Sequence, residues 1–298
     1  MQALQASMDA LEEKEPEKPQ EPQEPTPDKK LVQAIKINPQ AAVLTVGQSM
    51  SLAVAVSPAD ADNPSYALTS SSPAIASVSG TKVTAKKAGT ARIIAAASDG
   101  SGVTAEVRVT IRLKAVTKIK AVQRSSGQQV AVTFNKISGA KGYDVYRASK
   151  KNGAYKKIGS TKTTSFVDQK AQKGKTYFYK ITARAAKSES NSLCSSKYAS
   201  VKVLASPVAK CKAAKSGKVS VTWKKVSNAS GYVIYTSAQK TKGFKAAKTL
   251  TKGSAVKARI TAKKNRKTIY IKVRAFYRQN GKKIFGPYSK TVAVKAKK

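Results

Sequence analysis

The chain has 298 residues, in which 57 lysine and arginine side chains outnumber 15 aspartate and glutamate side chains and give a formal net charge of +42 at pH 7. It contains no histidine, which removes the commonest general base and metal ligand at neutral pH, and its two cysteines are too few for a disulfide framework. Only seven carboxylates follow residue 30, and no two of them combine the spacing and apolar setting of an acid/base pair, so we expect neither an enzyme nor a cofactor or metal site.

Residues 1–30 are predicted to form a disordered, extended spacer. Prolines recur through the Glu- and Gln-rich tract 15–25, where they withhold backbone hydrogen-bond donors, and the tract has almost nothing apolar to bury. No apolar signal-peptide core follows Met1, and no run of about 18 apolar residues occurs in the chain, so we expect no transmembrane insertion. We expect either an upstream domain or a true start before Met1, which would place this chain in a longer secreted protein.

Apolar and polar side chains alternate through residues 31–113, as they do in half-buried strands, for example at Leu52, Val54 and Val56. The polar stretch 60–63 has oxygen ligands of the kind that calcium needs, but a polar turn is the simpler interpretation. A hairpin turn is predicted where glycines follow Asp99.

The pattern of this region resembles a group 2 bacterial immunoglobulin-like domain. It runs from the strand 35–39 through 46–48 and 70–78 to the strand 82–91. Leu68 stands where that family usually carries a core tryptophan, which implies weaker packing but no lost function. The resemblance implies a β-sandwich that belongs to a cell-surface protein.

Residues 114–298 contain two copies of one module. A Gly-Tyr-x-x-Tyr motif at 142–146 returns at 231–235, and the strand-like run 175–181 returns at 267–273 with about three residues gained in between. A repeat of this length is too long for a solenoid and suits a domain that buries its own core. We therefore expect two tandem domains that fold independently.

The two copies, 114–205 and 206–298, each resemble a fibronectin type III module of the kind found on surface proteins of Gram-positive anaerobes. The resemblance places Tyr177 at the tyrosine corner of the family, a position that Ile269 takes in the second copy. It also implies a non-catalytic extracellular role. The same arrangement places the two cysteines in different modules and too far apart for a disulfide bridge.

Charge is distributed unevenly along the chain. Residues 31–113 carry 7 basic and 4 acidic side chains, whereas residues 114–298 carry 46 basic and 3 acidic ones. Such a polycation favours polyanionic partners: teichoic acids of the cell wall, anionic glycans including those of a host surface, acidic lipid surfaces or nucleic acid. The alternative is that the lysines only solvate strands and protect sheet edges from aggregation.

Twelve basic residues are expected to make the polyanion contacts: Lys150, Lys151, Lys156, Lys157, Lys162, Lys224, Lys225, Lys240, Lys242, Lys263, Lys264 and Arg266. Nucleic acid is disfavoured because single-strand recognition needs exposed aromatic rings among the lysines, and most aromatics here occupy inward strand positions. The aromatics that do not follow this rule, for which packing in the core or at an edge is the alternative role, are Tyr155, Phe178, Tyr270, Tyr277 and Phe285.

The sequence thus predicts an all-β protein of three tandem immunoglobulin-like and fibronectin type III β-sandwiches, 31–113, 114–205 and 206–298, behind the disordered linker 1–30. The predicted function is attachment at a bacterial surface or cell wall, as an extracellular monomer. A pure spacer that displays another domain is the alternative.

Overall fold

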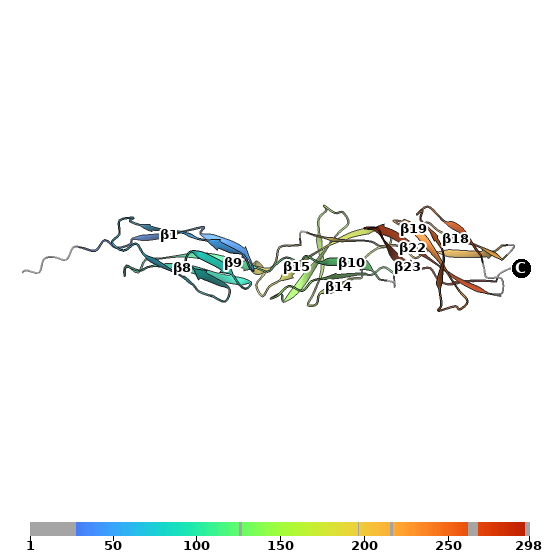
Figure 1. Cartoon of the computed structure of the whole chain (residues 1–298), viewed down its shortest axis with the longest axis horizontal. Coiled ribbons are helices and arrows are strands. Elements are labelled where there is room, and N and C mark those ends of the chain that lie inside the picture. Colours follow the sequence, from blue (N-terminus) through green and yellow to red (C-terminus); the bar gives the residue numbers. More distant parts are fainter. Residues whose placement is uncertain (1–27, 125–126, 196, 215–216, 262–267, 296–298) are drawn as a thin grey trace, which may run out of the picture.

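The computed structural model describes residues 28–124, 127–195, 197–214, 217–261 and 268–295. Within these ranges the chain is built from β-strands, with one short 3-10 helix, η1 (Ser188–Ser190). The strands form three successive sandwiches along the long axis of the molecule (Figure 1). The predicted all-β fold is therefore confirmed, while nearly all of the predicted linker lies outside the described residues.

The first sandwich places a four-stranded sheet, in the order β2-β9-β8-β5, against the pair β1-β4 and the three strands β3-β7-β6. Strand β2 runs parallel to β9, and the other pairs are antiparallel. The strands are β1 (Ala34–Asn38), β2 (Ala41–Thr45), β3 (Ser49–Ser51), β4 (Ala53–Ser57), β5 (Tyr66–Ser70), β6 (Ala76–Ser79), β7 (Lys82–Ala85), β8 (Gly89–Ala97) and β9 (Thr104–Arg112).

The core of the first sandwich follows the predicted alternation. Leu52 is buried, Val54 and Val56 pack against the core cluster, and Leu68 lies half-buried at its edge. Asp99 organises the predicted β8–β9 hairpin turn, because its carboxylate accepts the backbone N–H groups of Ser101 and Val32. The side chain of Ser101 first, and then the backbone bonds from Val32 and Ser101, lower the pKa of the Asp99 carboxyl group.

The second sandwich pairs a three-stranded sheet, β10-β11-β14, with a four-stranded sheet, β13-β12-β15-β16. Its strands are β10 (Ile119–Gln123), β11 (Val130–Phe134), β12 (Gly142–Ala148), β13 (Lys156–Thr161), β14 (Ser165–Asp168), β15 (Thr176–Arg184) and β16 (Ala199–Lys202). Inward residues of β15, such as Tyr179 and Ile181, are fully buried because successive side chains of a strand point to opposite faces.

The third sandwich repeats this plan with β17-β18-β21 against a larger sheet in which β20-β19-β22-β23 are in order and β24 also pairs with β22. Its strands are β17 (Ala209–Ala213), β18 (Lys218–Trp223), β19 (Gly231–Ser237), β20 (Lys245–Leu250), β21 (Lys257–Thr261), β22 (Ile269–Gln279), β23 (Lys282–Tyr288) and β24 (Val292–Val294). Equivalent strands pair in equivalent register, since Arg147 faces Tyr179 in one copy and Thr236 faces Ile271 in the other.

The joint between the first and second sandwiches is held by η1. Glu189 accepts hydrogen bonds from the Thr90 hydroxyl and from Arg108, each at 2.8 Å. The Leu113 N–H donates to the Ser190 carbonyl at 3.0 Å, and the Leu113 side chain packs in the second core. Thr90 first, and then Arg108, holds the pKa of the Glu189 carboxyl group below its usual range. Side chains of both sandwiches therefore fix this joint.

The joint between the second and third sandwiches is held by the buried side chain of Gln123. Its amide oxygen accepts from the Leu204 N–H at 2.8 Å, and its amide nitrogen donates to the carbonyls of Leu204 and Gly127 at 2.7 and 2.6 Å. Leu204 is fully buried in the third core. It lies so close to Gly286 that a Cβ there would stand 2.7 Å from the Leu204 Cβ atom. Leu204 precedes the predicted boundary between 205 and 206 yet packs in the third core, so the exact domain limits remain a prediction.

None of the helices in the described ranges is long and apolar enough to cross a membrane.

Candidate polyanion-binding surface

The structure describes nine of the twelve predicted basic contact residues, and all nine are exposed. Five lie along or beside the edge strand β13 of the second sandwich: Lys150, Lys151, Lys156, Lys157 and Lys162. Four lie in the loops before and after β19 of the third sandwich: Lys224, Lys225, Lys240 and Lys242. The other three, Lys263, Lys264 and Arg266, lie outside the described residues. The described nine thus form separate groups on two sandwiches and do not line one pocket.

Two residues of the β13 group already have partners within the protein. The Lys157 ammonium group lies 3.1 Å from the Asp144 carboxylate, which also accepts the Ser160 hydroxyl at 2.7 Å. The Lys151 ammonium group lies 5.8 Å from the centre of the Tyr198 ring. Lys157 therefore presents less uncompensated charge to a ligand than its neighbours do.

The three carboxylates of residues 114–298 are all engaged in ion pairs. Asp144 pairs with Lys157, Asp168 with Arg147, and Glu189 with Arg108 of the first sandwich. Apart from the chain terminus, the third sandwich has no carboxylate at all. Ion pairs within the protein thus neutralise few of the 46 basic side chains of this region, and its surface keeps nearly all of its positive potential.

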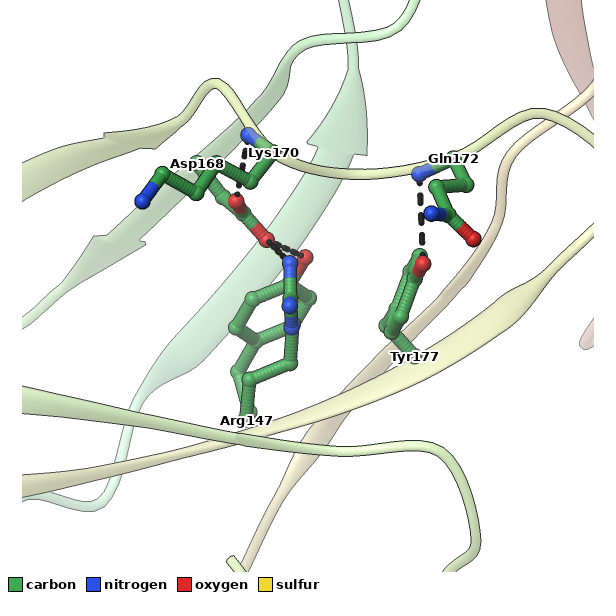
Figure 2. Close-up of polar contacts among 6 residues, drawn as sticks. Arg147, Asp168, Lys170, Gln172 and Tyr177 are labelled. Atoms are coloured by element: carbon green, nitrogen blue, oxygen red, sulfur yellow. Dashed lines mark hydrogen bonds and ion pairs between the residues drawn. The ribbon is translucent and has the colours of Figure 1, made fainter. Parts of the chain in front are cut away.

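Arg147 and Asp168 form a partly buried network in the second sandwich (Figure 2). The Asp168 carboxylate accepts from Arg147 Nη1 and from the Tyr179 hydroxyl, each at 2.8 Å, and its other oxygen accepts the Lys170 N–H at 3.0 Å. The Arg147 guanidinium lies 4.7 Å from the centre of the Tyr177 ring. Burial, and then the neighbouring Asp168, raises the pKa of Tyr179 above its ordinary value.

The same network is absent from the third sandwich, where the register places Thr236, Ile260 and Ile271 at the three equivalent positions. Both isoleucines are buried. Because one fold accommodates either this network or a threonine and two isoleucines at the equivalent positions, we interpret the network as local packing.

The tyrosine corner predicted for the second sandwich is present. The Gln172 N–H donates to the Tyr177 hydroxyl at 3.2 Å, as Figure 2 shows. Ile269 occupies this position in the third sandwich, as predicted, and has no hydroxyl to accept such a bond. The sandwich forms without it, which is consistent with the modest net value of about 1 kcal/mol for one hydrogen bond.

Sequence reasoning missed a second set of basic side chains that lie over aromatic rings. The Lys180 ammonium group is 4.8 Å from the centre of the Tyr155 ring, and the Lys272 ammonium group is 4.2 Å from that of Phe244. Both lysines occupy the outward positions of a central strand. A signal was present in the sequence, because the lysine and the aromatic residue after the glycine both recur in the two copies.

Of the aromatics singled out as exceptions to inward packing, Tyr277 is buried in the third core, so core packing is its role. Tyr155, Phe178, Tyr270 and Phe285 are half-buried. Phe178 packs edge-on against Tyr198 at a centroid distance of 5.3 Å. Several aromatic rings therefore lie at the surface among lysines, although the strand pattern predicted that most aromatic side chains point inward.

A groove of about 400 Å³ at the β13–β14 edge is lined by Arg147, Lys157 and Lys170 together with the paired Asp168. No cluster of metal-ligating side chains occurs in the described ranges.

Both cysteines are free; Cys211 is half-buried, and burial raises the pKa of its thiol to about 11. Cys211 faces Val221 just as Ala121 faces Val132, so its equivalent in the first copy is Ala121.

Residues 31–107 match the family model of the bacterial Ig-like domain (group 2), which confirms the resemblance of the first sandwich. No curated protein matches the chain. A domain of this immunoglobulin-like family fits a surface or extracellular module and is typically non-catalytic.

Solved structures similar to the chain include fibronectin type III proteins. The chicken CNTN1 FN1-FN3 domains are 15% identical, with a TM-score of 0.38, and the match covers 90% of this chain and 98% of that one. An Fn3-like protein from Clostridium thermocellum is 28% identical, with a TM-score of 0.28 and coverages of 30% and 92%. A two-domain fibronectin type III segment of chicken tenascin is 10% identical, with a TM-score of 0.31 and coverages of 61% and 100%.

Proposed function

We propose that this chain is a non-catalytic attachment module of a bacterial surface or cell-wall protein, whose residues 114–298 bind anionic wall polymers such as teichoic acid, or anionic glycans. The observation that carries the proposal is the engagement of all three carboxylates of this region in ion pairs beside 46 basic side chains. The first sandwich, with 7 basic and 4 acidic side chains, extends the module and contributes little to binding.

Binding of this kind rests on many weak contacts. Each phosphate that a lysine neutralises on a linear polyanion releases condensed counterions, so the logarithm of affinity falls about linearly with the logarithm of salt concentration. Reversal of one charge, as in Lys156→Glu, weakens binding only slightly. Reversal of Lys150, Lys156 and Lys162 together lowers both the affinity and the salt slope. Lys157 is kept because its pairing with Asp144 would confound the comparison.

The test is sedimentation of the full chain with purified cell walls, before and after chemical removal of teichoic acid, over a range of salt concentrations. We expect salt-sensitive binding that drops when the polymer is removed and that the triple reversal weakens. Salt-insensitive binding to one defined glycan, lost on a single substitution, would contradict the proposal and reveal a lectin-type site.

A pure spacer is the second candidate, and the joints favour it. Gln123 fixes the chain at Leu204, and Glu189 fixes η1 to the first sandwich, so the module has the ordered connections that a stalk requires. A spacer would not bind walls above the level of a neutral protein of the same length. The sedimentation experiment therefore separates the two functions.

A further inference from the structure

The outward face of the large sheet in the third sandwich carries a row in which aromatic rings and cations alternate. Lys272 lies between Phe244 and Tyr288, with its ammonium group 4.2 and 5.7 Å from their ring centres. Arg274, two residues further along β22, lies between Tyr288 and Phe285, with its guanidinium carbon 4.5 and 4.9 Å from their ring centres. Each cation of this row therefore has rings on two sides.

The second sandwich has a shorter version of the same arrangement. Lys180 faces Tyr146 across the strands just as Lys272 faces Tyr235, so the two lysines are equivalent in register. Each lies over the aromatic residue that precedes β13 or β20, Tyr155 or Phe244. The pairing thus occurs independently in two sandwiches that differ at many other positions.

These rings limit the movement of the cations. A lysine or arginine over a ring is attracted by the negative face of the aromatic system and loses less conformational freedom when an anion binds. Lys272 and Arg274 are half-buried, so part of each side chain is open to solvent, and Arg274 Nε donates to the Gly286 carbonyl at 2.6 Å, which further limits the movement of its guanidinium. Such a cation is a better anion contact than a lysine in a loop, which an anion has to immobilise first.

We infer that these ring-supported cations, Lys180, Lys272 and Arg274, are the principal polyanion contacts of the protein, and that their ligand is a linear polymer of phosphodiester-linked polyols. This inference rests on the proposed function and names its site. Cations two residues apart on one strand, as Lys272 and Arg274 are, stand about 7 Å apart. A three-carbon polyol between successive phosphates spans a similar length when extended, so neighbouring phosphates can reach neighbouring cations.

The same rings disfavour the other polyanions. Bases of single-stranded nucleic acid stack on free aromatic faces, and those faces are partly covered here by ammonium and guanidinium groups. A polyol phosphate has no ring to stack and needs only point charges. Charge complementarity supports it as well, because the third sandwich has no side-chain carboxylate to repel phosphate.

The experiment uses the full chain and poly(glycerol phosphate) of defined length as the probe, with affinity measured by titration calorimetry at about 50 to 300 mM salt. The first variant, Tyr155→Leu with Phe244→Leu, removes two rings and leaves the net charge unchanged. We expect it to bind about tenfold more weakly, at about threefold for each ring. Binding by net charge alone predicts no change.

The second variant, Lys180→Gln with Lys272→Gln, is compared with a control, Lys224→Gln with Lys240→Gln, which removes the same charge from exposed loops. We expect the first of these to lose several-fold more affinity than the control. This comparison decides the inference if thermal melting shows that the ring variant is misfolded.

Three outcomes would overturn the inference. Equal losses in the two lysine pairs would leave the proposed function intact and refute the assignment of these cations. Tighter binding of a single-stranded oligonucleotide of equal charge, which loses more affinity when the rings are removed, would identify base stacking. A full chain that binds no probe at low salt would refute the proposed function as well.

Discussion

Replacement of Gln123 by methionine tests whether the second and third sandwiches are energetically coupled. Methionine has nearly the same length as glutamine but cannot form the hydrogen bonds to the Leu204 N–H and carbonyl, which measure 2.8 and 2.7 Å. Leu204 is fully buried, so both backbone groups lose their partner in a place that water reaches poorly. Each unsatisfied group costs about 1 to 2 kcal/mol, which gives about 2 to 4 kcal/mol in all.

The readout is the fluorescence of Trp223, the only tryptophan of the chain, which is buried in the third core. Although the substitution lies in β10 of the second sandwich, we expect the Trp223 transition to shift to lower urea concentration and to melt about 10 °C lower or more. The matched control is Gln128→Met, since Gln128 is exposed on the same sandwich. A Trp223 transition that moves no further than in the control, within about 0.5 kcal/mol, would refute the coupling.

Three further predictions concern the joints and the core. Leu204→Ala should destabilise the third sandwich by about 2 to 5 kcal/mol in urea unfolding followed at Trp223, because Leu204 is part of that core. Leu193→Ala, at a side chain that is 63% exposed, should have almost no effect. The folded pKa of Glu189 lies below its ordinary value of 4.5, so its contacts with Thr90 and Arg108 are complete above that pH and are lost as pH falls through the lowered pKa. Energy transfer between dyes on the first and second sandwiches should show the joint loosening in that pH range. Glu189→Gln should flatten the dependence of energy transfer on pH. Asp168→Ala should lower the stability of the second sandwich by about 3 kcal/mol, because it leaves Arg147 partly buried without its anion. The triple change Arg147→Thr, Asp168→Ile, Tyr179→Ile copies the third sandwich and should lower the stability less. A triple variant that is no more stable than Asp168→Ala, measured by circular dichroism in urea, would contradict this.

Much of the fold follows from patterns that are local in the sequence. Alternation at 130–134 and 177–183 predicts strands because successive side chains of a strand face opposite sides, and the structure has β11 and β15 there. The repeat between 142–146 and 231–235 predicts equivalent sandwiches, whose registers match. The basic character of residues 114–298 is likewise a property of composition alone.

Contacts between residues far apart in the chain were decided only by the tertiary structure. Glu189 binds Thr90 across 99 positions, and Gln123 binds Leu204 across 81, so no spacing rule relates these pairs. The support of Lys272 by Tyr288 depends on the neighbouring positions of β22 and β23 in one sheet. The sequence by itself therefore determined three strand-built modules, of which the last two are strongly basic, because alternation and charge are local quantities. Which modules are held rigidly, and which lysines are held over rings, was settled by packing between segments that meet only in the folded chain.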